Sequence, residues 1–104
     1  MITINDNSCI IDVIGSFDAE CANKTNKRIT EEFSQEVHYD KIKLDLTWCT
    51  NIDNHGIGSI AYIKSIATKN KIPFTIAYCF GLEDVLSKCG AIWLLHIKAY
   101  MLII

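Results

Sequence analysis

Residues 52–58 read Ile-Asp-Asn-His-Gly-Ile-Gly and stand where a predicted strand and its loop give way to a helix. Asp and Asn are favoured as helix N-caps, because their side-chain oxygens accept hydrogen bonds from the amides of the first turn. A glycine two residues into the helix lets two backbone segments approach closely. On their own, these residues predict only the start of a helix.

The segments on either side of this stretch predict a strand, a loop and a helix. Residues 41–46 alternate between apolar and polar side chains, which is typical of a strand covered on one face. Residues 47–54 are predicted to be a loop, and residues 55–70 a helix that ends before Pro73. The expected core stripe of this helix consists of Ile57, Ile60, Ala61, Lys64 and Ala67, with Ile63 and Ile66 beside it.

The rest of the chain alternates strands and helices. Residues 2–13 predict a hairpin, and Asp18 is the expected N-cap of a helix. The buried face of that helix is expected to carry Ala22, Thr25, Ile29 and Phe33. Residues 74–80 predict a strand, residues 82–89 a short helix closed by Gly90, and residues 93–97 contain a final strand. This order predicts one α/β domain over residues 1–104, with a mixed sheet of four to five strands, an N-terminal hairpin and three to four helices.

Four segments in this order resemble the STAS family, the fold of the anti-sigma-factor antagonists. Residues 15–18, Gly-Ser-Phe-Asp, look like the family's Gly-x-x-Asp turn, and residues 44–47, Leu-Asp-Leu-Thr, look like its Leu-Asp-Leu-Ser strand end. Residues 52–58 are similar to its apolar-Asp-Ser-x-Gly-apolar-Gly signature, and residues 85–90 to a later helix end. The resemblance extends from residue 2 to about residue 97.

This resemblance implies a regulatory module that docks on an anti-sigma factor or a similar serine-kinase partner, rather than an enzyme. The family's phosphorylated serine is replaced here by Asn54, which has no hydroxyl to accept phosphate. The resemblance therefore implies a domain fixed in its binding-competent form, or one controlled in another way. Ser59, Thr47 and Thr50 are the nearby hydroxyls to consider. The expected partner-binding site consists of Asp18, Asp53, Asn54, His55, Gly56 and Ile57.

Composition narrows the classes of partner and cofactor. The net charge is -2 and no Lys/Arg run occurs, so direct nucleic-acid binding is not expected. Five cysteines without a Cys-x-x-Cys pair favour a reducing cytoplasm, and most are expected to be buried apolar residues. The histidines and cysteines lack metal-ligand spacing, so we expect neither a metal nor a cofactor.

Three alternatives stay open at this point. Within the family, the chain could be the STAS subunit of a lipid-transport type ABC transporter, bound to its ATPase. It could also be a small anion- or nucleotide-binding module, since helix N-termini attract anions. A catalytic arrangement of Cys49, His55 and Asp53 is the least favoured.

The C-terminal segment departs from the family pattern. Residues 91–104 are largely apolar but too short for the roughly 20 residues that span a bilayer, so membrane insertion is not expected. A core strand, or a surface buried against another subunit, is expected instead. Family members often close with an amphipathic, acidic helix, whereas residues 98–104 contain no acid. Either a last helix packs more deeply here, or this segment contacts another molecule, such as a second copy in a homodimer.

Overall fold

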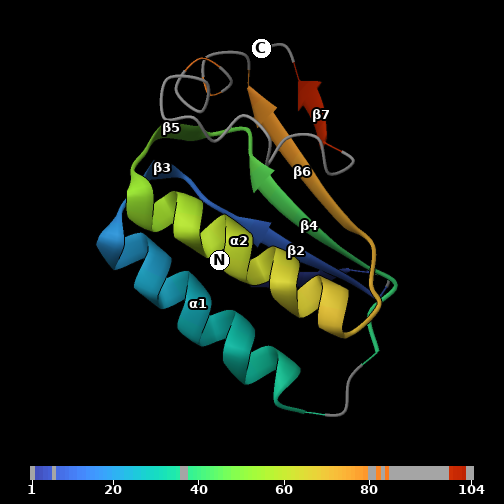
Figure 1. Cartoon of the computed structure of the whole chain (residues 1–104). Coiled ribbons are helices and arrows are strands. Elements are labelled where there is room, and N and C mark those ends of the chain that lie inside the picture. The colour runs from blue at the N-terminus through green and yellow to red at the C-terminus, as the bar shows by residue number, and fades with distance from the viewer. Residues whose placement is uncertain are drawn as a thin grey trace.

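A computed structural model describes residues 2–5, 7–35, 38–79, 82, 84 and 99–102. Its main sheet has five strands in the order β1-β2-β4-β6-β7 (Figure 1). The strands are β1 (Ile2–Asn5), β2 (Ser8–Asp12), β4 (Lys41–Leu46), β6 (Phe74–Cys79) and β7 (Ala99–Leu102). Strands β1 and β2 form an antiparallel hairpin, and all other neighbours are parallel. The predicted mixed sheet with an N-terminal hairpin is confirmed.

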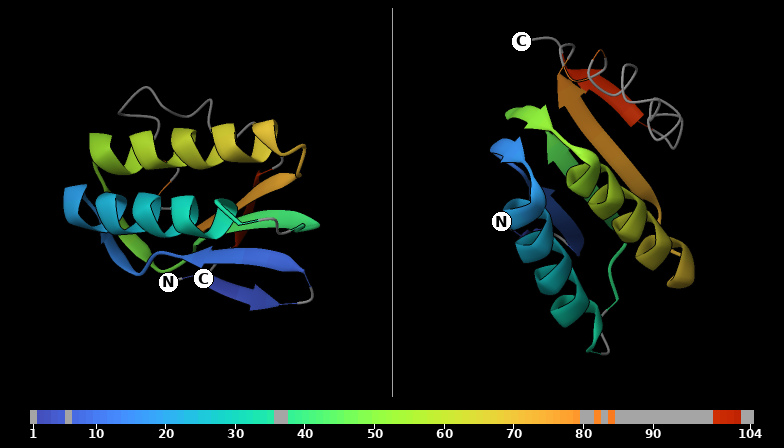
Figure 2. Two further views of the ribbon diagram at one scale, coloured as in Figure 1. Left: turned by 90° about the horizontal axis from the view of Figure 1, so that it is seen from below. Right: turned by 60° about the vertical axis from the view of Figure 1, so that its left-hand side comes forward.

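Two helices, α1 (Ala19–Phe33) and α2 (Asn54–Lys69), lie side by side on one face of this sheet (Figure 2). Strands β2, β4 and β6 follow one another across the sheet in one direction. Crossovers between parallel strands share one hand, so both connecting helices come to the same face. Of the three to four helices expected, these two lie in the described part of the chain. Leu82 and Asp84 have helical backbone, and the rest of the predicted helix at 82–89 lies outside the described residues.

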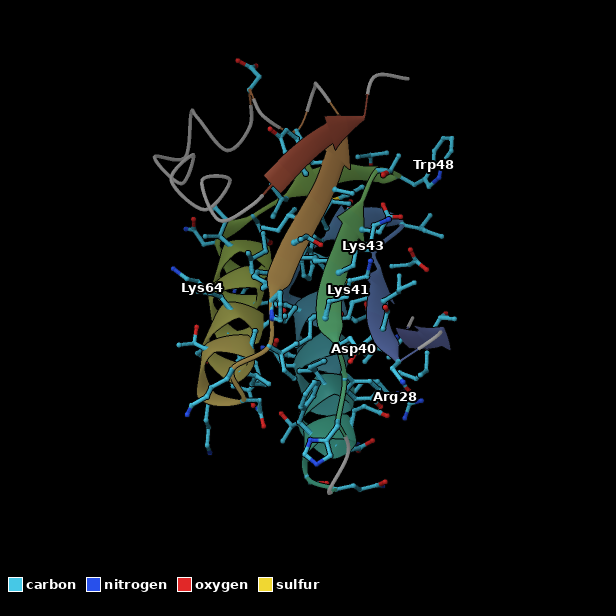
Figure 3. The ribbon with its side chains drawn as sticks, turned by 90° about the vertical axis from the view of Figure 1, so that its right-hand side faces the viewer. Arg28, Asp40, Lys41, Lys43, Trp48 and Lys64 are labelled. Atoms are coloured by element: carbon cyan, nitrogen blue, oxygen red, sulfur yellow. The ribbon has the colours of Figure 1, made fainter. Side chains whose placement is uncertain are left out.

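The core lies between this helical layer and the sheet. Six residues at alternate positions of β4 and β6 are buried in this core: Ile42, Leu44, Leu46, Phe74, Ile76 and Tyr78. On the alternate positions of β4, Lys41 is exposed and Lys43 is partly exposed (Figure 3). The one-sided strand that the alternation predicted is therefore confirmed.

The prediction of a turn at residues 15–18 and a loop at 47–54 is wrong in part. Strand β3 (Gly15–Phe17) and strand β5 (Cys49–Ile52) form a separate two-stranded parallel sheet. The sequence Cys-Thr-Asn-Ile hides this strand, because its two central residues are both exposed and it has no apolar-polar alternation. The pairing depends on a partner strand more than thirty residues away.

The core face of α2 also differs from the predicted stripe. Its buried residues are Gly56, Ser59, Ile60, Ile63 and Ala67, while Ala61 is exposed and Ile57 and Lys64 are partly exposed. The face is rotated toward α1, where the Ser59 hydroxyl donates to Asn26 Oδ1 at 2.6 Å. Two of these buried residues, Gly56 and Ser59, are not large apolar residues, so the spacing of apolar residues did not predict that they lie on the buried face.

The described residues of the C-terminal segment form a strand. Residues 99–102 are β7, which pairs in parallel with β6, so the core-strand alternative holds for these residues and a closing helix through them is wrong. The final strand predicted within 93–97 lies outside the described residues. Contact of the C-terminal segment with a second copy stays a prediction.

Candidate functional site

Each helix begins with an aspartate that caps its first turn. Asp18 precedes α1 and accepts a hydrogen bond from the Cys21 amide at 3.1 Å. Asp53 precedes α2, and its Oδ1 accepts from the amides of His55 at 2.8 Å and Gly56 at 3.2 Å. The predicted cap Asp18 is thereby confirmed, and of the two candidates at the second helix start, Asp53 and Asn54, the cap is Asp53.

The small β3–β5 sheet brings these two helix starts together. Phe17 pairs with Ile52, and the Asp53 amide donates to the Phe17 carbonyl at 3.3 Å. Asp18 and Asp53 each follow one member of this pair on adjacent parallel strands, which lie about 4.8 Å apart in any sheet. Residues separated by 35 positions in the sequence thus form one surface at this end of the molecule.

Gly56 is required by the close contact between α2 and β3. A Cβ atom at this position would lie 2.4 Å from the Phe17 carbonyl oxygen and 2.7 Å from Ile52 Cγ1. No real Cβ atom approaches a backbone oxygen so closely. Gly56 is buried, so within the predicted site it serves to seat the helix start rather than to touch another molecule.

The remaining predicted site residues differ in what they offer at the surface. Asn54 and His55 are exposed, Asp18 is exposed, and Ile57 is partly buried. His55 Nδ1 lies 3.5 Å from Asp53 Oδ1. Asn54 and His55 therefore form the accessible tip of α2, with Asp18 on the neighbouring helix start.

The carboxylate of Asp53 is held in its charged form. Partial loss of solvent acts to raise its pKa, but hydrogen bonds from the Gly56 and His55 amides and the proximity of the His55 ring outweigh this effect. The pKa of Asp53 consequently lies below its ordinary value. The amides of the α2 start are thus already satisfied by an anionic side chain.

The three hydroxyl groups near the site have different accessibility. Ser59 is 1% exposed and donates to Asn26, and the buried Thr47 hydroxyl has no hydrogen-bond partner in the described structure. Thr50, on β5, is exposed. Only Thr50 of these three presents its side chain at the surface.

A catalytic arrangement of Cys49, His55 and Asp53 gains no support from this geometry. Cys49 is buried, and its thiol donates to the Asn51 carbonyl at 3.2 Å. A nucleophile needs its base within hydrogen-bond reach and a path for substrate. Across the described part of the chain, no group of three or more His, Cys, Asp and Glu side chains is arranged to hold a metal ion.

Two exposed apolar side chains near this end were not singled out from the sequence. Trp48 is 63% exposed and Ile14 is 77% exposed, and they are linked through the Gly15 amide, which donates to the Trp48 carbonyl at 3.0 Å. Figure 3 shows Trp48 projecting at the end of the molecule. The sequence did contain an indication of this exposure: a tryptophan in a short polar connection has little apolar surface to pack against, so its side chain is expected at the surface.

Comparison with known proteins agrees with this architecture. The STAS domain family model matches residues 1–96, so the chain belongs to the STAS domain family, whose members are generally non-catalytic regulatory modules. The NMR structure of the protein TM1081 is similar, with a TM-score of 0.68 and 25% sequence identity over 96% of this chain and 78% of that one. No curated protein matches the chain at a significant level. No helix in the described ranges is both long and apolar enough to cross a membrane.

Proposed function

We propose that this chain is a regulatory binding module that docks the paired helix starts of α1 and α2 on a serine-kinase-type anti-sigma factor. The observation that carries the proposal is the Phe17–Ile52 pairing, which sets Asp18 beside Asp53 and leaves Asn54 and His55 exposed next to them. A surface built from two distant segments is rigid, because the small sheet fixes both. Rigid presentation reduces the entropy lost when a partner binds.

A protein partner suits this surface better than a small anion does. Helix N-termini bind phosphate through unpaired amides and the positive end of the helix dipole. At α2 the amides of His55 and Gly56 already donate to the Asp53 carboxylate. A phosphate would have to displace this carboxylate or lie beside its charge, so the nucleotide-binding alternative is disfavoured.

Asn54 makes the site independent of phosphate control in this proposal. The family resemblance places the regulated hydroxyl at this position, and an amide cannot be phosphorylated. A neutral, exposed Asn54 keeps the helix start free of the charge of about -1.5 to -2 that phosphate would add. The module then stays competent to bind whenever its partner is present.

Capture of the partner by the tagged full chain from its native cells, followed by mass spectrometry, tests the proposal. We expect a protein with a serine-kinase-type nucleotide-binding domain. Recovery of an ABC transporter ATPase instead would contradict the anti-sigma assignment and favour the transporter-subunit alternative.

Incubation of the purified complex with ATP tests the absence of phosphate control. We expect no phosphate at Asn54, and no change in partner affinity, because Ser59 and Thr47 are buried. If a site in this region is modified at all, exposure predicts Thr50. Phosphate at any of these hydroxyls together with release of the partner, seen by mass spectrometry and calorimetry, would contradict the proposal.

A further inference from the structure

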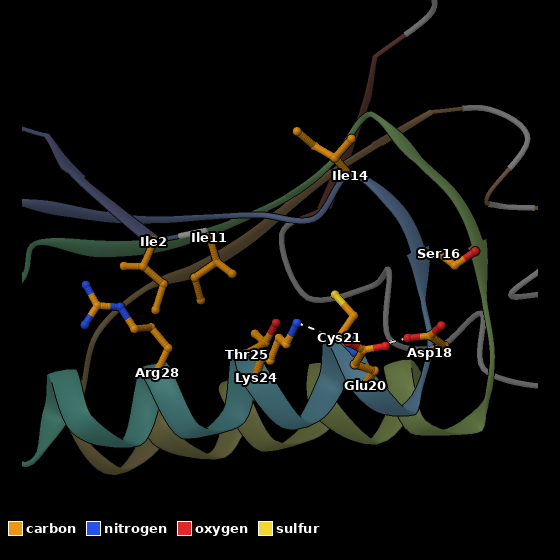
Figure 4. A pocket seen from close by; sticks show the side chains of 10 residues that line it. All are labelled: Ile2, Ile11, Ile14, Ser16, Asp18, Glu20, Cys21, Lys24, Thr25 and Arg28. Carbon is orange, nitrogen blue, oxygen red and sulfur yellow. Dashed lines mark hydrogen bonds and ion pairs between the residues drawn. The ribbon is translucent and has the colours of Figure 1, made fainter.

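A groove of about 610 Å³ runs between the outer flank of α1 and the edge of the sheets (Figure 4). Ile2, Ile11 and Ile14 line its apolar side, and α1 lines the other side with residues that include Thr25 and Arg28. Asn54 and His55 do not line the groove, whereas Asp18, which begins α1, belongs to both surfaces. Its size is within the usual range for a binding site.

The backbone that borders the groove forms hydrogen bonds along one edge. The Val13 amide donates to the Asp45 carbonyl at 3.1 Å, and the Gly15 amide donates to the Trp48 carbonyl at 3.0 Å. Both bonds point toward β4 and β5, away from β1. Alternate residues of a strand direct their N–H and C=O groups to opposite edges.

Ser16 lies in β3 between Gly15 and Phe17, whose backbone groups bond toward β5, so the N–H and C=O of Ser16 are directed to the other edge. Ile14 lies between β2 and β3, next to the open end of that edge. Strand β1 does not cover them, since its register begins with Ile2 opposite Ile11. Among the described strands, β3 has β5 as its sole neighbour. An open strand edge beside a helix is the arrangement in which other proteins bind an extended peptide as an added strand.

Charge is distributed unevenly along the groove. Figure 4 shows Arg28 at the end near Ile2, and Asp18 at the end near Ser16. In the middle, Lys24 Nζ lies 3.2 Å from Glu20. Arg28 is exposed and forms no ion pair within the described residues, so its guanidinium is available for a carboxylate.

We propose that this groove binds an extended segment of a partner protein, which adds as a strand antiparallel to β3 and in line with β1. The ten residue steps from the cap Asp18 to Arg28 correspond to about 15 Å along α1, which matches roughly five extended residues. In the antiparallel direction the segment ends beside Arg28, so it carries a carboxylate near its C-terminal end and a cation near its N-terminal end, beside Asp18. A second copy is a poorer occupant, because its edge strand Ile2–Asn5 contains no charged residue.

Two blocked peptides of identical composition test this proposal with the full chain. The first is acetyl-Lys-Val-Thr-Val-Glu-amide, and the second has the reversed sequence, acetyl-Glu-Val-Thr-Val-Lys-amide. Titration into the ¹⁵N-labelled protein is followed by NMR. We expect the first peptide to shift the amide signals of Ile14 and Ser16, and the reversed peptide to bind about tenfold more weakly.

Two charge reversals on α1 provide the matched control. Arg28→Glu is expected to remove the preference between the peptides, whereas Lys27→Glu, one residue away and outside the groove lining, keeps it. Neither variant touches Asn54 or His55, so failure here leaves the function proposed for the helix starts intact. Dodecanoate, a fatty acid, serves as the probe for a small apolar ligand in place of a peptide. Three results would overturn the proposal: no shifts at Ile14 and Ser16, equal affinity for both peptides, or binding of dodecanoate at these residues without binding of either peptide.

Discussion

Gly56 and Gly58 stand two residues apart in α2 but have opposite surroundings. A Cβ atom at Gly56 would collide with the Phe17 carbonyl, whereas a Cβ atom at Gly58 meets nothing within 4 Å. We expect Gly56→Ala to lower the free energy of unfolding by about 1–3 kcal/mol or more, because the helix start must move away from β3. Gly58→Ala should raise it by roughly 0.5–1 kcal/mol, because alanine favours the helix.

Urea unfolding of the two variants beside the parent measures this difference. Both variants add the same methyl group to the same helix, so intrinsic helix propensity is matched between them. Equal effects from the two changes would contradict the close contact between α2 and β3.

Asp53 gives a prediction about pH. Its pKa is lowered in the folded state, so its stabilising effect is complete above the unfolded value and is lost as the pH falls through the folded value. Asp53→Asn keeps a capping side chain but removes the titrating group. The parent should therefore melt at a higher temperature than the variant at neutral pH, and this gap should close below about pH 4.

Melting curves of both proteins over this pH range test the assignment. The two proteins differ only at residue 53, so the difference between their melting temperatures reports on the Asp53 carboxylate. A gap that stays constant or widens in acid would show that the carboxylate is not stabilised in its charged form.

Local residue chemistry explains which parts of the site the sequence could predict. The cap Asp18 was predictable, and the second cap could be narrowed to Asp53 or Asn54, because an N-cap depends mainly on the next three residues. A close backbone approach at Gly56 was expected from the sequence, but the groups that approach it were not, because they belong to Phe17 and Ile52, and Phe17 comes from a distant segment.

At the scale of elements, the buried face of α2 carries the contact with the sheet. Ile60 is fully buried, whereas Ile57, one turn earlier, is partly exposed. We expect Ile60→Ala to lower the free energy of unfolding by about 2–5 kcal/mol, as large-to-small changes in a core do. Ile57→Ala removes the same atoms and should have a clearly smaller effect. Comparable losses for the two variants in chemical denaturation would show that the helix face is assigned wrongly.

The same helix shows why its phase was harder to predict than its existence. Apolar residues surround much of the segment, so spacing alone did not fix the centre of the buried face. The hydrogen bond between Ser59 and Asn26 turns the helix toward α1 and leaves Ala61 exposed. A polar contact between two helices produces no apolar pattern in the sequence of either helix.

At the scale of the whole molecule, the mixed sheet with its N-terminal hairpin and the one-sided cover of β4 followed from alternating strand and helix patterns. The small β3–β5 sheet did not, since it joins two short segments with weak patterns. Yet this sheet places Asp18 next to Asp53, and so converts two separate helix starts into one candidate surface. Each helix start was predictable by itself, whereas their position beside each other is a property of the tertiary fold.

The central claim is that the exposed start of α2 lies within the partner interface, and Asn54→Asp tests it most directly. Asp is tolerated in the first turn, where the helix dipole favours a negative charge, so the melting temperature should change little. Asn7→Asp, in the hairpin turn at the opposite end of β2, adds the same charge as a control, and its left-handed backbone accepts Asp as well as Asn.

Calorimetric titration of the captured partner into the parent and both variants, beside their melting temperatures, gives the answer. We predict that Asn54→Asp weakens binding at least about tenfold, because an unpaired charge is buried in the interface, while Asn7→Asp leaves the affinity unchanged. Unchanged affinity for Asn54→Asp in a stably folded protein would contradict the placement of the α2 start in the partner interface. The role of these residues would then be limited to capping the helix.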